Sequence, residues 1–197
     1  MIETIIFDLG GVLVHLDWDK VFAPLEQLSE QSAEFVRSEI LNGPIVLESM
    51  KGAIGPDEFH RMMCEKLGIE ISYKDFVDIW NRLLRSNEGI SPLVEELKPE
   101  YALILGSNTD QIHFPYSVQH FPVLKHFDRY FLSYDMRLVK PDPEFFLKIL
   151  HDLAVSPESC LFIDDRPENV ASAREVGITA LRFVGIQKLR RDLAAIV

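Results

Sequence analysis

The chain has 197 residues, 47% of them hydrophobic, and its 31 acidic residues outnumber the 20 basic ones, which gives a formal net charge of -11. This length fits one large hydrophobic core with an insert better than two equal domains, and the apolar content excludes disordered and collagen-like chains. The negative charge disfavours nucleic acid and anionic lipid as partners. No apolar run approaches the roughly 18 residues of a membrane span, so no membrane association is expected.

The N-terminal segment MIETIIFDLGGVLV has an early glutamate and no basic residue before its apolar run, unlike a secretion signal. Cys64 and Cys160 allow at most one disulfide, and Cys160 lies in the apolar run CLFID, where a reduced thiol is the common state. We therefore expect a cytoplasmic protein, a monomer or weak homodimer.

Five short apolar runs predict buried β-strands, and polar residues followed by helical periodicity come after most of them. These segments are 2–8, 101–110, 129–135, 159–170 and 177–185. Strands that alternate with helices in this way predict an α/β fold with a parallel sheet.

Residues 17–89 follow a different pattern. FVRSEILNG, DEFHRMMCEKLG and YKDFVDIWNRLL carry apolar residues at three- and four-residue spacing, which predicts an all-helical insert after the first strand. The expected domains are therefore a core of residues 1–16 plus 90–197 and a cap of residues 17–89. An insert at the carboxyl end of a strand overhangs the place where open α/β sheets bind ligands, so we expect it to act as a lid.

Polar side chains follow the predicted strands at their carboxyl ends. They are Asp8, Ser107, Asn108, Lys140, Asp164 and Asp165. These ends converge in a parallel sheet, and three carboxylates held together repel one another unless their pKa values rise or a cation binds. The hard oxygen ligands favour Mg²⁺ over zinc, and the metal would also let an anionic substrate approach an acidic protein.

This set of residues indicates phosphoryl transfer. Asp8 beside a metal could attack phosphorus and form an aspartyl-phosphate that water then hydrolyses. Lys140 would neutralise phosphate oxygens, and Ser107 with Asn108 would hold the phosphate by hydrogen bonds. Each residue alone has a simpler interpretation, as a turn, a helix cap or a surface lysine, but their order at successive strand ends favours a site.

The motifs FDLGGVLV, ILGSNTD, LVKPDPEFF and FIDDRPENV resemble the four ordered motifs of the haloacid dehalogenase superfamily of phosphatases. The helical insert is similar to the small cap of subfamily IA, and the DLGGVL opening resembles sugar phosphatases of the α-glucose-1-phosphate type. The resemblance implies a three-layer, Rossmann-like core. It also implies that Asp8, Asp164 and the carbonyl of Gly10 bind Mg²⁺, with Asp165 as a further ligand or a water-positioning group.

One position departs from the family pattern. Family phosphatases usually carry a second aspartate two residues after the nucleophile as general acid and base, and here that residue is Gly10. Losing such a group typically costs about 10²- to 10⁴-fold in rate. His15 and Asp17 are the nearest titratable replacements, and water ordered by the metal is another route.

The leading hypothesis is a Mg²⁺-dependent phosphatase of a small phosphorylated metabolite, with a sugar phosphate favoured. A 2-haloacid dehalogenase is the first alternative, but Asp164 and Asp165 without a metal would repel its carboxylate substrate. A catalytically weakened protein that binds a phosphorylated metabolite is the second alternative, and the missing side chain at Gly10 motivates it.

Overall fold

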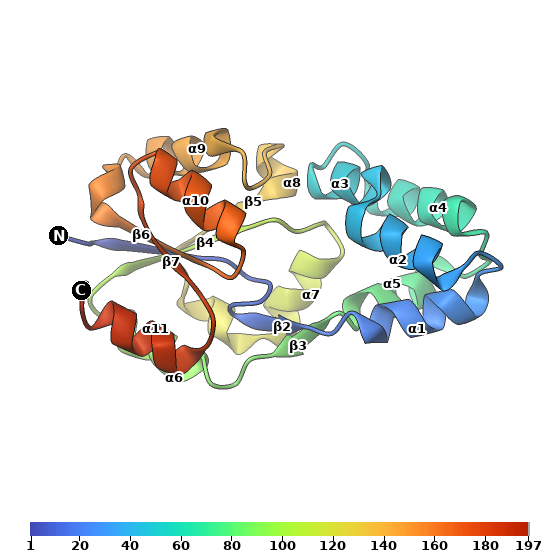
Figure 1. Ribbon diagram of the computed structural model, residues 1–197, viewed down its shortest axis with the longest axis horizontal. Helices are drawn as coiled ribbons and strands as arrows, with labels where there is room; N and C mark the ends of the chain where they lie inside the picture. Colours follow the sequence, from blue (N-terminus) through green and yellow to red (C-terminus); the bar gives the residue numbers. More distant parts are fainter. Residues whose placement is uncertain (197) are drawn as a thin grey trace.

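The computed structural model describes residues 1–196, which form an α/β core and a helical cap joined by a pair of short strands (Figure 1). The core sheet contains β1 (Thr4–Phe7), β4 (Ala102–Ser107), β5 (Arg129–Leu132), β6 (Cys160–Asp164) and β7 (Thr179–Arg182). The strand order is β5-β4-β1-β6-β7, and each neighbouring pair is parallel. The expected α/β fold class with a parallel sheet is confirmed.

Helices cover both faces of this sheet. They are α6 (Ser91–Leu97), α7 (His113–His120), α8 (Ser133–Met136), α9 (Pro143–Leu153), α10 (Pro167–Glu175) and α11 (Ile186–Leu193), with 3-10 turns η1 (Pro122–His126) and η2 (Pro157–Ser159). Ile5 and Phe7 of β1 belong to the hydrophobic cluster of Val94 in α6, whereas Ile6 belongs to the cluster of Phe145 in α9. Both faces of the central strand are therefore buried, as is usual in parallel sheets.

The cap consists of five helices between β2 (Val14–Leu16) and β3 (Leu84–Ser86). They are α1 (Asp19–Leu28), α2 (Ala33–Asn42), α3 (Pro44–Met50), α4 (Pro56–Leu67) and α5 (Tyr73–Asn81). The hydroxyls of Ser32 and Ser72 cap α2 and α5, and proline begins α3 and α4, which are common helix starts. All five helices lie within residues 17–89.

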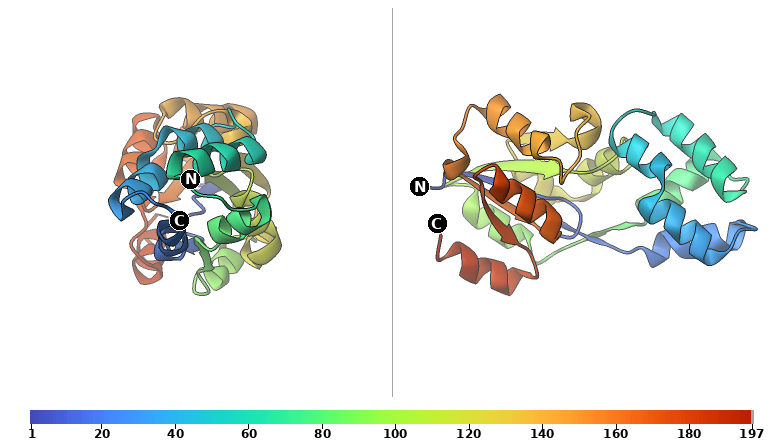
Figure 2. Two further views of the ribbon diagram at one scale, coloured as in Figure 1. Left: turned by 90° about the vertical axis from the view of Figure 1, so that its right-hand side faces the viewer. Right: turned by 45° about the horizontal axis from the view of Figure 1, so that its top comes forward.

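The two connections between cap and core form an antiparallel pair, β2 with β3, which the right-hand view of Figure 2 shows as a narrow bridge. Val14 pairs with Ser86, His15 with Arg85 and Leu16 with Leu84. The structure differs here from the expectation, because β3 lies inside the segment predicted to be all-helical. Three residues are too few to show a period in the sequence, and the partner strand lies far away in the chain.

A buried polar cluster fastens the cap to the core beside this bridge. The indole Nε1 of Trp80 in α5 donates to Asp110 Oδ2 at 3.0 Å, and His113 Nδ1 lies 3.2 Å from the same oxygen. His113 Nε2 lies 2.9 Å from the carbonyl of Trp80, and the two rings stack with centroids 5.2 Å apart. Both ring nitrogens of His113 face acceptors, so the imidazolium form fits this position.

The charges in this cluster support each other. Burial opposes ionisation of Asp110, but the charge and hydrogen bonds of His113 and the indole of Trp80 lower its pKa to about 2. Burial also opposes a positive His113, yet the carboxylate of Asp110 raises its pKa above the ordinary value.

Among residues 1–196, no helix combines the length and the apolar character that crossing a bilayer requires.

Candidate active site

Lys140 ties together the carboxyl ends of three strands. Its Nζ donates to Asp8 Oδ1 at 2.7 Å after β1, to the Gly106 carbonyl at 2.8 Å in β4, and to Asp164 Oδ2 at 2.7 Å in β6. An ammonium group has three hydrogens, so these contacts use all of them. The side chain is almost completely buried, which means that the sequence places a charged lysine at the centre of the crevice.

The pKa of Asp8 lies well above the ordinary value of an aspartate. Burial raises its pKa to about 7 and the charges of Asp164 and Asp165 add to this effect, while the ammonium of Lys140 opposes it. Its Oδ1 accepts the hydrogen bond from Lys140, and within residues 1–196 no other residue donates to Oδ2. A further cation beside Asp8 would favour the ionised, nucleophilic form.

Three carboxylates lie close enough to share a metal ion. Asp8, Asp164 and Asp165 each offer an oxygen, and these oxygens lie within 4.8 Å of one another. Hard carboxylate oxygens in this arrangement suit Mg²⁺. The residues present therefore fit the metal that the sequence predicted.

The hydrogen bonds separate the roles of the two adjacent acids. Asp164 Oδ1 accepts from the backbone N–H of Arg166 at 2.8 Å and from Asn169 Nδ2 at 3.1 Å. Its Oδ2 accepts from Lys140 and from Asn169 Nδ2 at 2.9 Å. A carboxylate has about four lone-pair positions, so the partners of fully buried Asp164 already use them.

Asp165 differs from its neighbour. Its carboxylate is half-buried, and within residues 1–196 it accepts no side-chain hydrogen bond. Burial raises its pKa, and the charge of Asp164 raises it further. Asp8 and Asp165 thus present free oxygens to a cation, whereas Asp164 orients Lys140.

Ser107 and Asn108 lie at the end of β4, beside this centre. The side chain of Asn108 accepts from the backbone N–H of Lys140 through Oδ1 at 2.8 Å and donates to its carbonyl through Nδ2 at 2.8 Å. Asn108 therefore holds the Lys140 loop in place and keeps one N–H for a ligand. The hydroxyl of Ser107 makes only a long 3.4 Å contact with the Asn108 carbonyl, which leaves it available to a phosphate oxygen.

The space above Gly10 contains an apolar side chain. A Cβ atom on Gly10 would lie 3.3 Å from Cδ2 of Leu16, a residue of β2. Leu16 lines both the large crevice at the site and a smaller adjoining cavity that reaches Gly10 and Ser107. A leucine therefore lies where a side chain on Gly10 would project.

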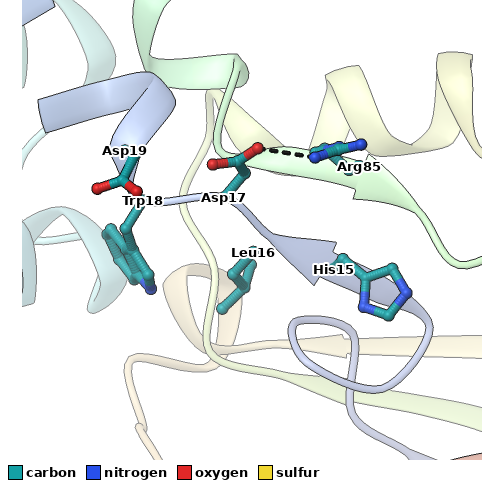
Figure 3. A pocket seen from close by; sticks show the side chains of 6 residues that line it. All are labelled: His15, Leu16, Asp17, Trp18, Asp19 and Arg85. Carbon is teal, nitrogen blue, oxygen red and sulfur yellow. Dashed lines mark hydrogen bonds and ion pairs between the residues drawn. The ribbon is translucent and has the colours of Figure 1, made fainter. Parts of the chain in front are cut away.

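The structure places His15 and Asp17 outside the crevice that holds Asn108, Lys140 and Asp165. They line a second hollow, beside the bridge. In this hollow the side chain of Asp17 points toward Arg85 and away from Leu16 (Figure 3). The carboxylate of Asp17 pairs with the guanidinium of Arg85 at 2.9 Å. The acid roles of His15 and Asp17 stay predictions, and this geometry does not support them.

Two groups at the site were not predicted from the sequence. Asn169 lies within the motif FIDDRPENV, but no role was given to its amide, which fixes both oxygens of Asp164. The sequence did offer a signal for it, because Asn169 lies on the buried side of the helix that follows Asp164 and Asp165. The Trp80–Asp110–His113 cluster gave no signal, because its members come from two domains.

Comparisons with known proteins identify the family of this chain. Residues 2–177 match the family model described as haloacid dehalogenase-like hydrolase. The chain belongs to this family. This haloacid dehalogenase-like hydrolase is 26% identical to a D-ribitol-5-phosphate phosphatase of Bacteroides thetaiotaomicron over 100% of its own length and 99% of the relative. It is 23% identical to a phosphorylated carbohydrates phosphatase of Thermotoga maritima over 99% and 90% of the two chains.

A solved structure of the family has the same fold. It is a haloacid dehalogenase family enzyme from Bacteroides thetaiotaomicron in complex with magnesium and inorganic phosphate, with a TM-score of 0.84, 31% identity and coverage of 92% of this hydrolase and 94% of that chain. The expected family, its α/β fold and its assignment as an enzyme of the haloacid dehalogenase phosphatase type are confirmed.

Proposed function

We propose that this hydrolase is a Mg²⁺-dependent phosphatase of a small phosphorylated metabolite and that it acts through an aspartyl-phosphate on Asp8. The observation that carries the proposal is the Asp8 carboxylate, which lies 2.7 Å from the Lys140 ammonium and shares one cluster with Asp164 and Asp165. The names of the full-length relatives make phosphorylated carbohydrates the first class to test.

The chain's own residues account for both halves of the reaction. Oδ2 of Asp8 attacks phosphorus, and the bond from phosphorus to the alcohol oxygen breaks. Oδ1 accepts from Lys140 with one lone pair and keeps the other for a cation. The departing alcohol oxygen takes a proton from a water molecule in the crevice, because Gly10 carries no acid side chain. The hydroxide that remains attacks the phosphoryl group, inorganic phosphate departs, and the Asp8 carboxylate is restored.

The surrounding groups lower the energy of this transfer. Lys140 stabilises negative charge on the phosphoryl oxygens, and Ser107 with the free N–H of Asn108 supplies hydrogen bonds. Asp8, Asp165 and the carbonyl of Gly10 would hold Mg²⁺. The family resemblance instead implied Asp164 as a ligand and Asp165 as a further one, but the hydrogen bonds that Asp164 accepts from Lys140, Asn169 and Arg166 favour the reverse assignment. When bound, the metal neutralises phosphate charge and counters repulsion among the acids.

The experiment is a phosphate-release assay on a panel of phosphorylated sugars and other small phosphate esters. Wild type and Asp8→Asn are compared in Mg²⁺ and in EDTA. Release by wild type in Mg²⁺, with loss in EDTA and in Asp8→Asn, is the expected result. Equal inactivity of both proteins toward the whole panel would overturn the proposal, and retained ligand binding in that case would favour a phosphometabolite sensor.

The dehalogenase alternative has its own readout. Halide release from a 2-haloacid that persists in EDTA would assign Asp8 an attack on carbon instead of phosphorus. The repulsion of a carboxylate substrate by Asp164 and Asp165 argues for a negative result.

A further inference from the structure

The crevice above the site has walls of different chemistry on its two sides. Its volume is about 600 Å³, within the range of small-molecule sites. Asn108, Lys140 and Asp165 of the core form part of its floor, so any ligand that fills it is in contact with the proposed phosphate site. The cap and the bridge supply the opposite side, which we call the roof.

The roof is almost entirely apolar. Its residues are Leu16, Trp18, Ile40, Leu41, Val46, Leu47 and Met50, together with Asn42 and Gly43. Only the amide of Asn42 and the indole N–H of Trp18 can form side-chain hydrogen bonds there. The adjoining cavity of about 90 Å³ continues this surface, because Leu16, Trp18, Val46 and Met50 line it as well.

The roof also exposes large apolar side chains. Leu16, Leu41 and Leu47 are 37%, 49% and 42% exposed, although all three lie on one crevice. Grouped exposed leucines cost free energy unless a ligand or partner covers them, and such patches usually mark binding sites. The charged floor directly below them indicates a ligand with an anionic end and an apolar body.

A polyhydroxylated substrate matches this roof poorly. Each hydroxyl held against the leucines without a partner loses its hydrogen bonds to water, whereas methylene or aromatic groups gain from leaving water. We propose, resting on the phosphatase function above, that the preferred substrate is a phosphate monoester with an aryl or alkyl group. A phosphorylated carbohydrate fits the crevice when it carries such a group.

Esters of primary alcohols test this preference with similar leaving groups. Benzyl phosphate and hexyl phosphate are compared with glucose 6-phosphate and ribitol 5-phosphate in Mg²⁺, and kcat/KM is measured for each. The apolar esters are expected to exceed the polyol esters by about tenfold or more, the size that apolar pocket contacts give. Equal or faster hydrolysis of the polyol esters would overturn the inference and leave the phosphatase function standing.

A matched pair of variants locates the effect. Leu47 on the roof and Leu147 on α9 are both 42% exposed, and Leu147 does not line the crevice. Leu47→Asn is expected to lower kcat/KM for hexyl phosphate about fivefold to tenfold more than it lowers kcat/KM for glucose 6-phosphate. Leu147→Asn should change neither. An equal effect of Leu47→Asn on both esters would contradict a role in recognising the apolar group.

Binding separates the two proposals if turnover fails. Asp8→Asn is titrated calorimetrically with hexyl phosphate and with glucose 6-phosphate in Mg²⁺. Tighter binding of hexyl phosphate than of glucose 6-phosphate supports the apolar roof. If the wild type nevertheless releases no phosphate, the missing turnover overturns only the phosphatase function. Equal or weaker binding of hexyl phosphate contradicts the roof proposal.

Discussion

Gly11 and Asp165 lie in such close contact that a Cβ atom on Gly11 would fall 2.5 Å from Asp165 Oδ2. Gly11 also has a φ of +81°, which side-chain-bearing residues rarely adopt. The turn that follows Asp8, the proposed nucleophile, is therefore packed directly on the acid proposed to bind metal. A glycine here lets the turn after β1 pack against the carboxylate of Asp165 without a clash.

Gly11→Ala is expected to lower kcat by at least about tenfold and to weaken Mg²⁺ binding, because the new methyl group displaces the Asp165 carboxylate. Phosphate release and calorimetric Mg²⁺ titration measure the two effects. Gly177→Ala is the matched control, since Gly177 has a φ of +89° but its Cβ would meet only Pro157, at 3.4 Å. It should lose about 1 kcal/mol of stability and keep activity. Similar activity loss in both variants would mean that backbone strain alone matters.

Asp165→Asn should mainly weaken Mg²⁺ binding, whereas Asp164→Asn should mainly lower kcat. Asp165 has free oxygens, so its amide variant is expected to raise the Kd for Mg²⁺ about tenfold or more. Asp164 is bonded to Lys140 and Asn169, so its variant should reduce kcat while Mg²⁺ affinity changes less than about threefold. Calorimetric Mg²⁺ titration of the two variants measures this directly. A larger loss of affinity in Asp164→Asn would make Asp164 the principal ligand, as the family resemblance implies.

His113 should make stability depend on pH. Its pKa is raised above the ordinary value of 6.5, so the stabilisation is complete below about pH 6.5 and is lost as pH rises through the folded pKa. His113→Gln leaves buried Asp110 without its charge partner and is expected to cost about 3–5 kcal/mol at pH 6. Urea unfolding at pH 6 and pH 9 should show a smaller difference from wild type at the higher pH.

The control for this measurement is His151→Gln, because the His151 side chain is 87% exposed and its pairing with Asp152 lies at the surface. That variant should change the unfolding free energy by less than about 0.5 kcal/mol at either pH. A difference between wild type and His113→Gln that is constant from pH 6 to pH 9 would show that His113 does not titrate there.

His15→Ala and Asp17→Asn are expected to leave the acid limb of the pH–rate profile unchanged, since neither residue lines the crevice above Lys140. Asp17→Asn removes an exposed ion pair with Arg85, which is worth less than about 1 kcal/mol. The profile of kcat/KM between pH 4 and pH 9 checks both variants. A shift of that limb in either one would restore the residue as the replacement for the missing acid at Gly10.

The core fold was predictable because its signals are local. Apolar runs that end in polar residues, such as IIFD before Leu9 and LFID before Asp165, mark buried parallel strands in the sequence itself. β2 and β3 escaped prediction, because strands of three residues have no measurable period and pair across the whole cap.

The candidate site shows the same division. The positions of Asp8 and Asp164 at strand ends followed from the pattern, since parallel strands bring their carboxyl ends to one edge. Lys140 was expected directly after a strand but lies in the loop between α8 and α9. The partners of each group did not follow, because a lysine before a proline reads as a surface residue until it is seen buried between two aspartates.

The sequence by itself determined which residues gather at the edge of the sheet, since local patterns of apolar and polar residues mark each strand and its polar end, and parallel strands bring these ends to one edge. Only the tertiary structure decided which contacts each of these residues makes and therefore which role each can have. It assigns Asp164 to Lys140 and leaves Asp165 free, turns Asp17 outward to Arg85, and sets Leu16 above Gly10. The reason is physical: hydrogen-bond saturation and side-chain direction depend on contacts between segments far apart in the chain, and no local pattern records them.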